Sequence, residues 1–243
     1  MTTRILLILL SLALFINNSY AAASSDTESQ QQIQHIRDLL QHIVDANLQY
    51  KDKFHTIISE SALSRQTPKI TVLLCSDSRV DTRIISDAPI GEVFVIRNIG
   101  NQLETSYGSV EYGVLELATE LLLIIGHSQC GAVKAAMHDY SQEPYYVRKE
   151  LDTLEVNNKA ALNANIVKNV SNQVKDAVAN FSDRIKDNKL VVIGMVYDLH
   201  NDFKYGDGQL ILVNINNNTD PHVLAEHKYI SGLNNLVIMS QEN

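Results

Sequence analysis

Two short segments of this 243-residue chain carry side chains that could bind a metal ion. Cys75 directly follows an apolar run at 70–74, and His127 and Cys130 directly follow another run at 121–126. Two thiolates and one imidazole are a typical ligand set for zinc. A catalytic zinc site takes three protein ligands and keeps a fourth position for water. These three residues therefore predict one Zn²⁺ per subunit.

The same two cysteines are the only ones in the chain, and they could instead form a disulfide. An even number of cysteines in an exported protein usually does so. The chain would then be a non-enzymatic secreted domain in which His127 has no role. The neighbouring sequence favours a metal site, because both motifs follow apolar runs typical of buried parallel strands. Open α/β sheets place their ligand sites at the carboxyl ends of such strands.

The residues around the three ligands form two motifs. Residues 75–79 read Cys-Ser-Asp-Ser-Arg, and residues 127–130 read His-Ser-Gln-Cys. They resemble the CxDxR and HxxC motifs of the β-class carbonic anhydrases, whose cysteines and histidine hold zinc. The resemblance extends over residues 51–236 through three further matches, which are Arg97-Asn98-Ile99-Gly100-Asn101, Glu111-Tyr112 and Val196-Tyr197-Asp198.

This resemblance implies zinc-dependent reversible hydration of carbon dioxide to bicarbonate and a proton, by a zinc-bound hydroxide. Arg79 would keep Asp77 ionised, and Asp77 would accept a hydrogen bond from the hydroxide and so orient it. In some family members this Asp is a fourth zinc ligand in a closed state. The residues alone also allow a helix cap at Asp-Ser-Arg. The ligands do not separate carbon dioxide from CS₂ or COS as the substrate of a related zinc enzyme.

The segment Gln66-Thr67-Pro68-Lys69 resembles the plant-like branch of the family. The resemblance implies that Gln66 donates to bicarbonate, that Phe94 and Tyr112 line the carbon dioxide cleft, and that the Gly131 amide faces the zinc ligand. For the two aromatic residues, a place in the core is the alternative. The branch that bicarbonate regulates has Trp where this chain has Val72, so we expect an open resting site without that regulation.

The remaining pattern predicts an α/β fold. Apolar runs alternate with helical patterns, which predicts a mainly parallel central sheet of four strands flanked by helices. A further run after a Gly-Asp-Gly turn predicts an antiparallel edge strand. The predicted strands are 70–74, 93–96, 121–125, 190–196 and, for the antiparallel strand, 210–215. Helices are expected at 107–120 and at 150–185, the latter with a break near 157–158.

The amino terminus predicts export. A basic residue, an apolar stretch of about a dozen residues and small residues near position 21 or 23 are typical of a signal peptide. We therefore expect a signal peptide at 1–23 and a single domain at 24–243, periplasmic if the source is a Gram-negative bacterium. The apolar stretch is short for a membrane span, so the mature form should not be membrane-embedded.

Residues 24–50 are expected to form a leader and a helical arm. Apolar residues between 33 and 48 recur at helical spacing, which predicts an amphipathic helix. The resemblance implies that this arm reaches over a partner subunit, giving a homodimer or a higher even oligomer. Packing on its own subunit would produce the same pattern.

The charge of the chain argues against nucleic acid as a partner. Its formal net charge is −8, and it contains no Trp. The sequence also has no run of Lys or Arg that could neutralise phosphates, and few aromatic side chains on which bases could stack.

Overall fold

The computed structural model describes residues 2–87 and 90–240, with side chains from residue 30 onwards. The chain divides into two units, Met1–Ile57 and Ile58–Asn243. Within the part described with side chains, no helix is both long enough and apolar enough to cross a bilayer.

The first unit is one helix, α1 (Thr2–Ile57). It contains the helix predicted at 33–48, and the apolar side chains of that stretch are 44–61% exposed. The expected signal peptide at 1–23 precedes the residues whose side chains are described, and Met1 lies outside the described residues altogether. Export therefore stays a prediction.

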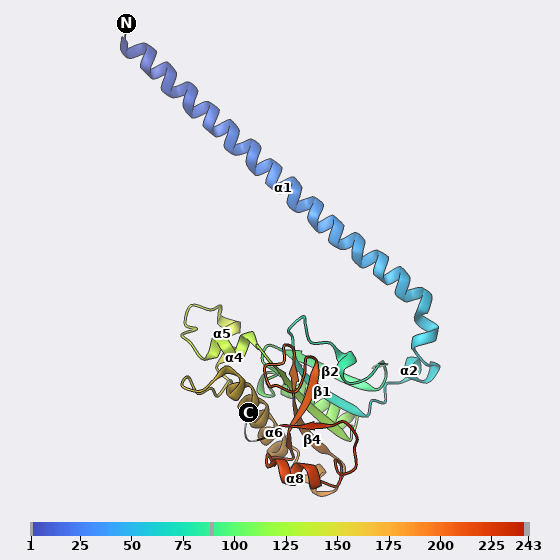
Figure 1. The fold of residues 1–243 in the computed structure, drawn as a ribbon. Helices are drawn as coiled ribbons and strands as arrows, with labels where there is room; N and C mark the ends of the chain where they lie inside the picture. The colour runs from blue at the N-terminus through green and yellow to red at the C-terminus, as the bar shows by residue number, and fades with distance from the viewer. Residues whose placement is uncertain (1, 88–89, 241–243) are drawn as a thin grey trace. The chain divides into compact units, whose positions relative to one another are not determined.

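The second unit is built on a six-stranded sheet (Figure 1), whose order is β2-β1-β3-β4-β5-β6. The first four strands run parallel, which confirms the expected sheet, and β5 is antiparallel to β4. The strands are β1 (Ile70–Cys75), β2 (Val93–Asn98), β3 (Leu121–His127), β4 (Val191–Asp198), β5 (Gln209–Ile215) and β6 (Val237–Ile238).

The predicted edge position of the antiparallel strand needs one correction. β6 pairs in parallel with Ile211 and Leu212 of β5, so β5 is not the outermost strand. β6 has only two residues, too few to show the alternation or the apolar run by which strands are recognised.

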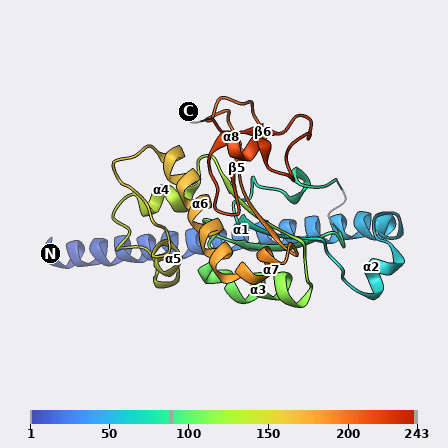
Figure 2. The ribbon, with the colours of Figure 1, turned by 90° about the horizontal axis from the view of Figure 1, so that it is seen from below.

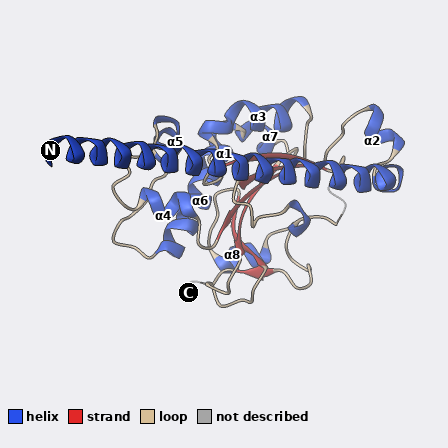
Figure 3. Ribbon diagram, turned by 90° about the horizontal axis from the view of Figure 1, so that it is seen from above, coloured by secondary structure: helices blue, strands red, loops and turns tan. Residues whose placement is uncertain are grey.

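Helices cover both faces of the sheet (Figures 2 and 3). One face packs mainly against α3, α4, α5 and α6, and the other packs against α8 and the loops around it. The helices of this unit are α2 (Glu60–Ser64), α3 (Tyr107–Glu111), α4 (Gly131–Ala136), α5 (Tyr145–Leu151), α6 (Leu162–Asn180), α7 (Ser182–Lys186) and α8 (Pro221–Glu226).

The two predicted helical regions are more broken than their patterns suggested. The region 107–120 forms α3 and then a π-helical turn (Tyr112–Glu116), and it ends before Ala118, which has a φ of +54° and is exposed. The region 150–185 contains the expected break, but the break covers 152–161 and separates α5 from α6. Backbone turns and side-chain caps of this kind leave little trace in apolar spacing.

Helix α6 lies close to the sheet because two adjacent strands carry glycine beneath it. A Cβ on Gly126 would lie 2.7 Å from Val170, and a Cβ on Gly194 would lie 2.8 Å from the same side chain. Such approaches are well below van der Waals contact, so neither strand could carry a larger residue without moving α6. The close packing brings the polar residues of α6 near the loops at the carboxyl ends of the strands.

Candidate metal centre

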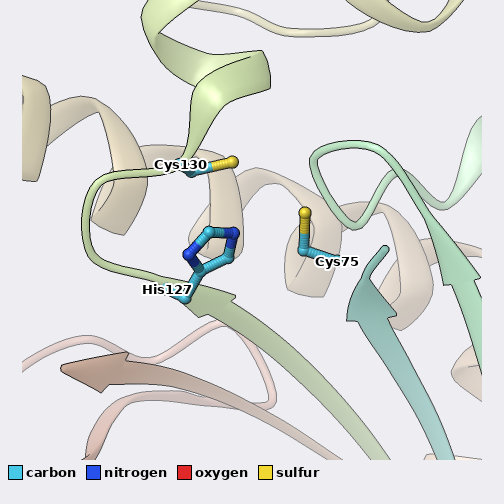
Figure 4. A group of neighbouring side chains, drawn as sticks. All are labelled: Cys75, His127 and Cys130. Atoms are coloured by element: carbon cyan, nitrogen blue, oxygen red, sulfur yellow. The ribbon is translucent and has the colours of Figure 1, made fainter. Parts of the chain in front are cut away.

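The three predicted ligands converge at the carboxyl edge of the sheet (Figure 4). Cys75 is the last residue of β1, His127 is the last residue of β3, and Cys130 directly precedes α4. Their ligand atoms all lie within 4.8 Å of one another, and all three residues are buried. β1 and β3 are hydrogen-bonded parallel neighbours, which is why the two strand ends lie side by side.

The imidazole of His127 is oriented for metal binding. Its Nδ1 lies 2.9 Å from the Ser128 carbonyl oxygen. A carbonyl can only accept, so Nδ1 carries the proton and Nε2 has a free lone pair. Nε2 is buried and has no hydrogen-bond partner among the described residues. A buried polar atom without a partner is costly, and a metal ion at this position would satisfy it.

Both cysteines are free, which opposes the disulfide alternative. The Cys130 thiol hydrogen-bonds to Cys75, which lowers the pKa of Cys75, and the same bond raises the pKa of Cys130. The Gly100 amide also donates to the Cys75 sulfur at 3.4 Å. The lowered pKa favours the thiolate form of Cys75, and the donor set of two sulfurs and one nitrogen fits zinc.

Asp77 and Arg79 form the predicted ion pair beside the cluster. Arg79 Nε donates to Asp77 Oδ1 at 2.9 Å, and an Arg79 terminal nitrogen donates to Oδ2 at 2.7 Å. These bonds hold the pKa of Asp77 well below its usual range. Asp77 Oδ2 lies 3.9 Å from His127 Nε2, so the carboxylate faces the ligands. The Arg79 amide also donates to Oδ1 at 3.0 Å, which stabilises a turn. No helix begins at this turn, because the next helical segment (Thr82–Ile84) is capped by Asp81, so Asp77 is not a helix cap.

Arg97, which matches the family motif, is held by backbone. Its Nε donates to the Cys75 carbonyl oxygen at 3.1 Å, and a terminal nitrogen donates to the Val80 carbonyl. Val72 is fully buried within β1. The guanidinium therefore fixes the chain on both sides of the Asp77–Arg79 turn.

Three of the predicted cleft residues lie near the amino ends of the parallel strands, away from the metal cluster at the carboxyl ends. Gln66 precedes β1 and is exposed. Phe94 pairs with Thr71, four positions before Cys75, which is about 13 Å along a strand. The ring of Tyr112 lies 5.9 Å from the ring of Phe94 and is 46% exposed, so it is not a core residue. Within one chain, these three residues therefore lie away from the metal cluster. Their roles stay predictions.

The fourth predicted cleft residue lies beside the ligands. Gly131 is the first residue of α4 and directly follows Cys130. Apart from its chain neighbours and the backbone of its own helix, no described atom lies within 4 Å of where its Cβ would be. Its surroundings are therefore open, as a residue next to a substrate would require.

A loop after β4 supports the segment between the candidate ligands. Asp198 ends β4, is fully buried, and accepts hydrogen bonds from the amides of Asp202 and Phe203 at 2.9 and 2.8 Å. Gln129, which lies between the ligands at a φ of +55°, donates to Asp202 at 3.1 Å. The Val196-Tyr197-Asp198 match includes Asp198, but it does not predict the partners of this residue, which are backbone amides of the following loop.

A comparison with protein families finds that the carbonic anhydrase model matches residues 70–204. A carbonic anhydrase of Synechococcus elongatus is 37% identical over 91 residues, which cover 34% of this chain and 33% of that protein. A carbonic anhydrase of Mycolicibacterium smegmatis is 40% identical over 78 residues, covering 32% of this chain and 38% of that protein. The matched part of the chain spans little more than a third of these relatives.

Solved structures support the fold independently. The β-carbonic anhydrase CcaA superimposes with a TM-score of 0.63 at 21% identity, over 72% of this chain and 95% of that chain. A tetrameric β-carbonic anhydrase of Sordaria macrospora gives a TM-score of 0.61 at 23% identity, over 73% and 98% of the two chains. At these identities the likeness establishes the architecture of the sheet and helices.

We predict that the purified protein binds one zinc ion per chain and that both its thiols are reduced, because a disulfide could not supply the thiolates. Metal analysis and thiol titration under denaturing, chelating conditions measure the two quantities. His127→Gln should lose the zinc, whereas the control His138→Gln, at an exposed residue outside the cluster, should keep it. A quantitative Cys75–Cys130 disulfide without metal would contradict the prediction.

Proposed function

Because this chain belongs to the carbonic anhydrase family, whose model matches residues 70–204, we propose that it hydrates carbon dioxide reversibly to bicarbonate and a proton. The observation that carries the proposal is the buried Cys75, His127 and Cys130 cluster with the Asp77–Arg79 pair facing it. Zinc is the cofactor that this donor set fits best.

Each residue of the centre then has a distinct task. When bound, zinc would lower the pKa of a water molecule and so supply the nucleophile. Cys75 and Cys130 would provide two negative charges that balance the ion, and His127 Nε2 would provide the neutral third ligand. The Ser128 carbonyl keeps the imidazole in the required tautomer through its bond to Nδ1.

Asp77 is the group that can orient the nucleophile. Arg79 binds both of its oxygens and keeps it ionised, so it can only accept a hydrogen bond. Its Oδ2 faces His127 Nε2, on the side where the metal would lie. Because Arg79 holds the carboxylate in this position, we assign Asp77 to orientation in the resting state rather than to a fourth metal bond.

The substrate cleft requires a second copy of the chain. Gln66, Phe94 and Tyr112 lie at the amino edge of the sheet, away from the metal cluster of their own chain. Strand β2 is the outermost strand on one side of the sheet, and its residue Val95 is exposed. The adjoining π-helical turn exposes Tyr112 and Leu115. An apolar, unpaired strand edge of this kind is suited to association. We therefore propose a homodimer or higher even oligomer in which the partner supplies the cleft residues.

The proposed site of action is outside the inner membrane. The amino-terminal pattern of the sequence supports a signal peptide of about 21 to 23 residues, as signal peptides are typically 15–30 residues long. In a Gram-negative source the mature enzyme would be periplasmic, and its two cysteines would be protected from oxidation by the bound zinc.

Removing the orienting pair should reduce turnover without removing the metal. We expect Asp77→Asn and Arg79→Ala to keep zinc and to lower kcat/KM at least about tenfold, or about 1.4 kcal/mol of transition-state stabilisation. Stopped-flow carbon dioxide hydration measures the rate, and the same assay with CS₂ and COS should show no faster reaction.

The chain contains a matched control for this pair. Arg83 binds Asp81 through the same three contacts, at 2.8, 3.0 and 3.0 Å, but the pair is exposed and lies outside the cluster. Asp81→Asn and Arg83→Ala should therefore leave kcat/KM within about twofold of wild type. Equal losses from both pairs would mean that Asp77 and Arg79 act only on the fold.

The pH profile distinguishes an open site from a closable one. The pKa of Asp77 is lowered by Arg79, so this carboxylate stays ionised above about pH 5, and its contribution to stability is lost only as the pH falls further. From pH 9 to pH 6, activity should fall along a single titration curve set by the nucleophile, and added bicarbonate should not steepen it. A cooperative loss near neutrality that bicarbonate enhances would show a closed state.

A mixing experiment tests the shared cleft. Cys75→Ser removes the metal and Gln66→Ala removes a cleft residue, and each variant alone should have at most about a tenth of wild-type activity. If the partner supplies Gln66, co-refolded equal mixtures contain dimers with one intact site and recover about a quarter of wild-type activity. The control mixture of Gln66→Ala with the double variant Cys75→Ser/Gln66→Ala should recover none. Failure of the first mixture to recover would place each cleft within one chain.

A further inference from the structure

Helix α6 carries a row of buried amide side chains. Asn165, Asn169 and Gln173 are spaced by four residues, so they lie on one face of the helix, and they are 1–5% exposed. Buried amides are costly unless they are hydrogen-bonded. A helix face of apolar residues would have covered the sheet at lower cost, so the partners of these amides indicate what they do.

Two amides converge on a single carbonyl next to the metal cluster. Asn169 Nδ2 donates to the Gly100 oxygen at 2.9 Å, and Gln102 Nε2 donates to the same oxygen. The two side chains also bond each other at 2.9 Å. Gln173 closes the network by donating to Gln102 Oε1 at 3.1 Å and accepting from the Leu103 amide at 2.7 Å. The Gly100 carbonyl is thus held from the side of α6.

The other end of Gly100 contacts a predicted zinc ligand. Its amide N–H donates to Cys75 Sγ at 3.4 Å. Gly100 has a φ of +79°, a backbone conformation that residues with a side chain rarely adopt. A Cβ added at this position would lie 3.3 Å from Ala132. The direction of the N–H therefore depends on an unusual backbone conformation, which the bonds to the carbonyl stabilise.

We propose that Asn169 is a positioning residue for the metal centre, acting through Gly100 on the Cys75 sulfur. A hydrogen bond to a thiolate withdraws electron density from the sulfur and fixes its orientation. Two thiolates of which one accepts this hydrogen bond would neutralise a bound ion less than two without it, so the site would favour a stronger activation of water. This inference rests on the proposed zinc site. It adds to that site Asn169, which lies 94 positions after Cys75 in the chain.

Asn165 provides a matched control on the same helix. It is buried to the same extent as Asn169, at 1% against 2% exposed. Its amide instead bonds the loop before α6, accepting from the Asn157 amide at 2.7 Å and donating to the Asn157 carbonyl at 3.0 Å. Replacing either Asn by Ala removes the same atoms from the same helix face, but only Asn169→Ala removes a donor to the Gly100 carbonyl.

Cobalt(II) substitution reports directly on the sulfur. Cobalt–thiolate centres absorb in the near ultraviolet, and loss of a hydrogen bond to sulfur should move this band to longer wavelength because the sulfur electrons are held less tightly. We expect the shift in Asn169→Ala and not in Asn165→Ala. Zinc affinity, measured by competition with a chelator, should fall at least about tenfold in Asn169→Ala and less than about threefold in the control.

The outcomes separate this inference from the zinc proposal. An unshifted band in Asn169→Ala, or equal changes in both variants, would overturn the inference and leave the zinc site standing. Absence of any thiolate band in the cobalt-loaded wild type would overturn both. If Asn169→Ala does not fold, Gln102→Met removes the other donor to the Gly100 oxygen at similar volume, and the same shift is expected. An unshifted band there would equally overturn the inference.

Discussion

Two sulfurs and one imidazole nitrogen are held within 4.8 Å of one another inside the protein, and much of the structure around them serves that arrangement. Removing such groups from water is unfavourable unless they find partners. The parallel pairing of β1 with β3 brings two of the three ligands to adjacent strand ends. The turn from β3 into α4 brings the third. The sheet therefore determines where the centre lies, and the turns determine its shape.

The surroundings of the centre consist largely of backbone groups. The Ser128 carbonyl sets the tautomer of His127, and the Gly100 amide contacts the Cys75 sulfur. Arg97 binds two backbone carbonyls on either side of the Asp77 turn. Farther away, on α6, Asn169 binds the carbonyl of Gly100. The three candidate ligands are thus surrounded by a hydrogen-bond network that extends to α6.

The residues of the proposed active site lie at both ends of the parallel strands. The carboxyl edge carries the ligands and the Asp77–Arg79 pair, and the amino edge carries Gln66, Phe94 and Tyr112. In the proposed assembly, each site combines the carboxyl edge of one chain with the amino edge of another. Catalysis would then depend on association, and an exposed apolar edge at β2 would be maintained for that reason.

The sequence by itself determined the candidate ligands, the ion pair and the parallel sheet, because each depends on residue type and short-range spacing. Cys75 and His127 follow short, continuous apolar runs typical of buried parallel strands, Cys130 lies three residues after His127, and Asp77 and Arg79 are separated by one residue. The tertiary structure alone decided the short strand β6, the extent of the break before α6, the opposite location of Phe94 and Tyr112, and the contact of Asn169 with Gly100. These features arise from backbone hydrogen bonds and from packing between distant segments, which no local pattern of side chains records.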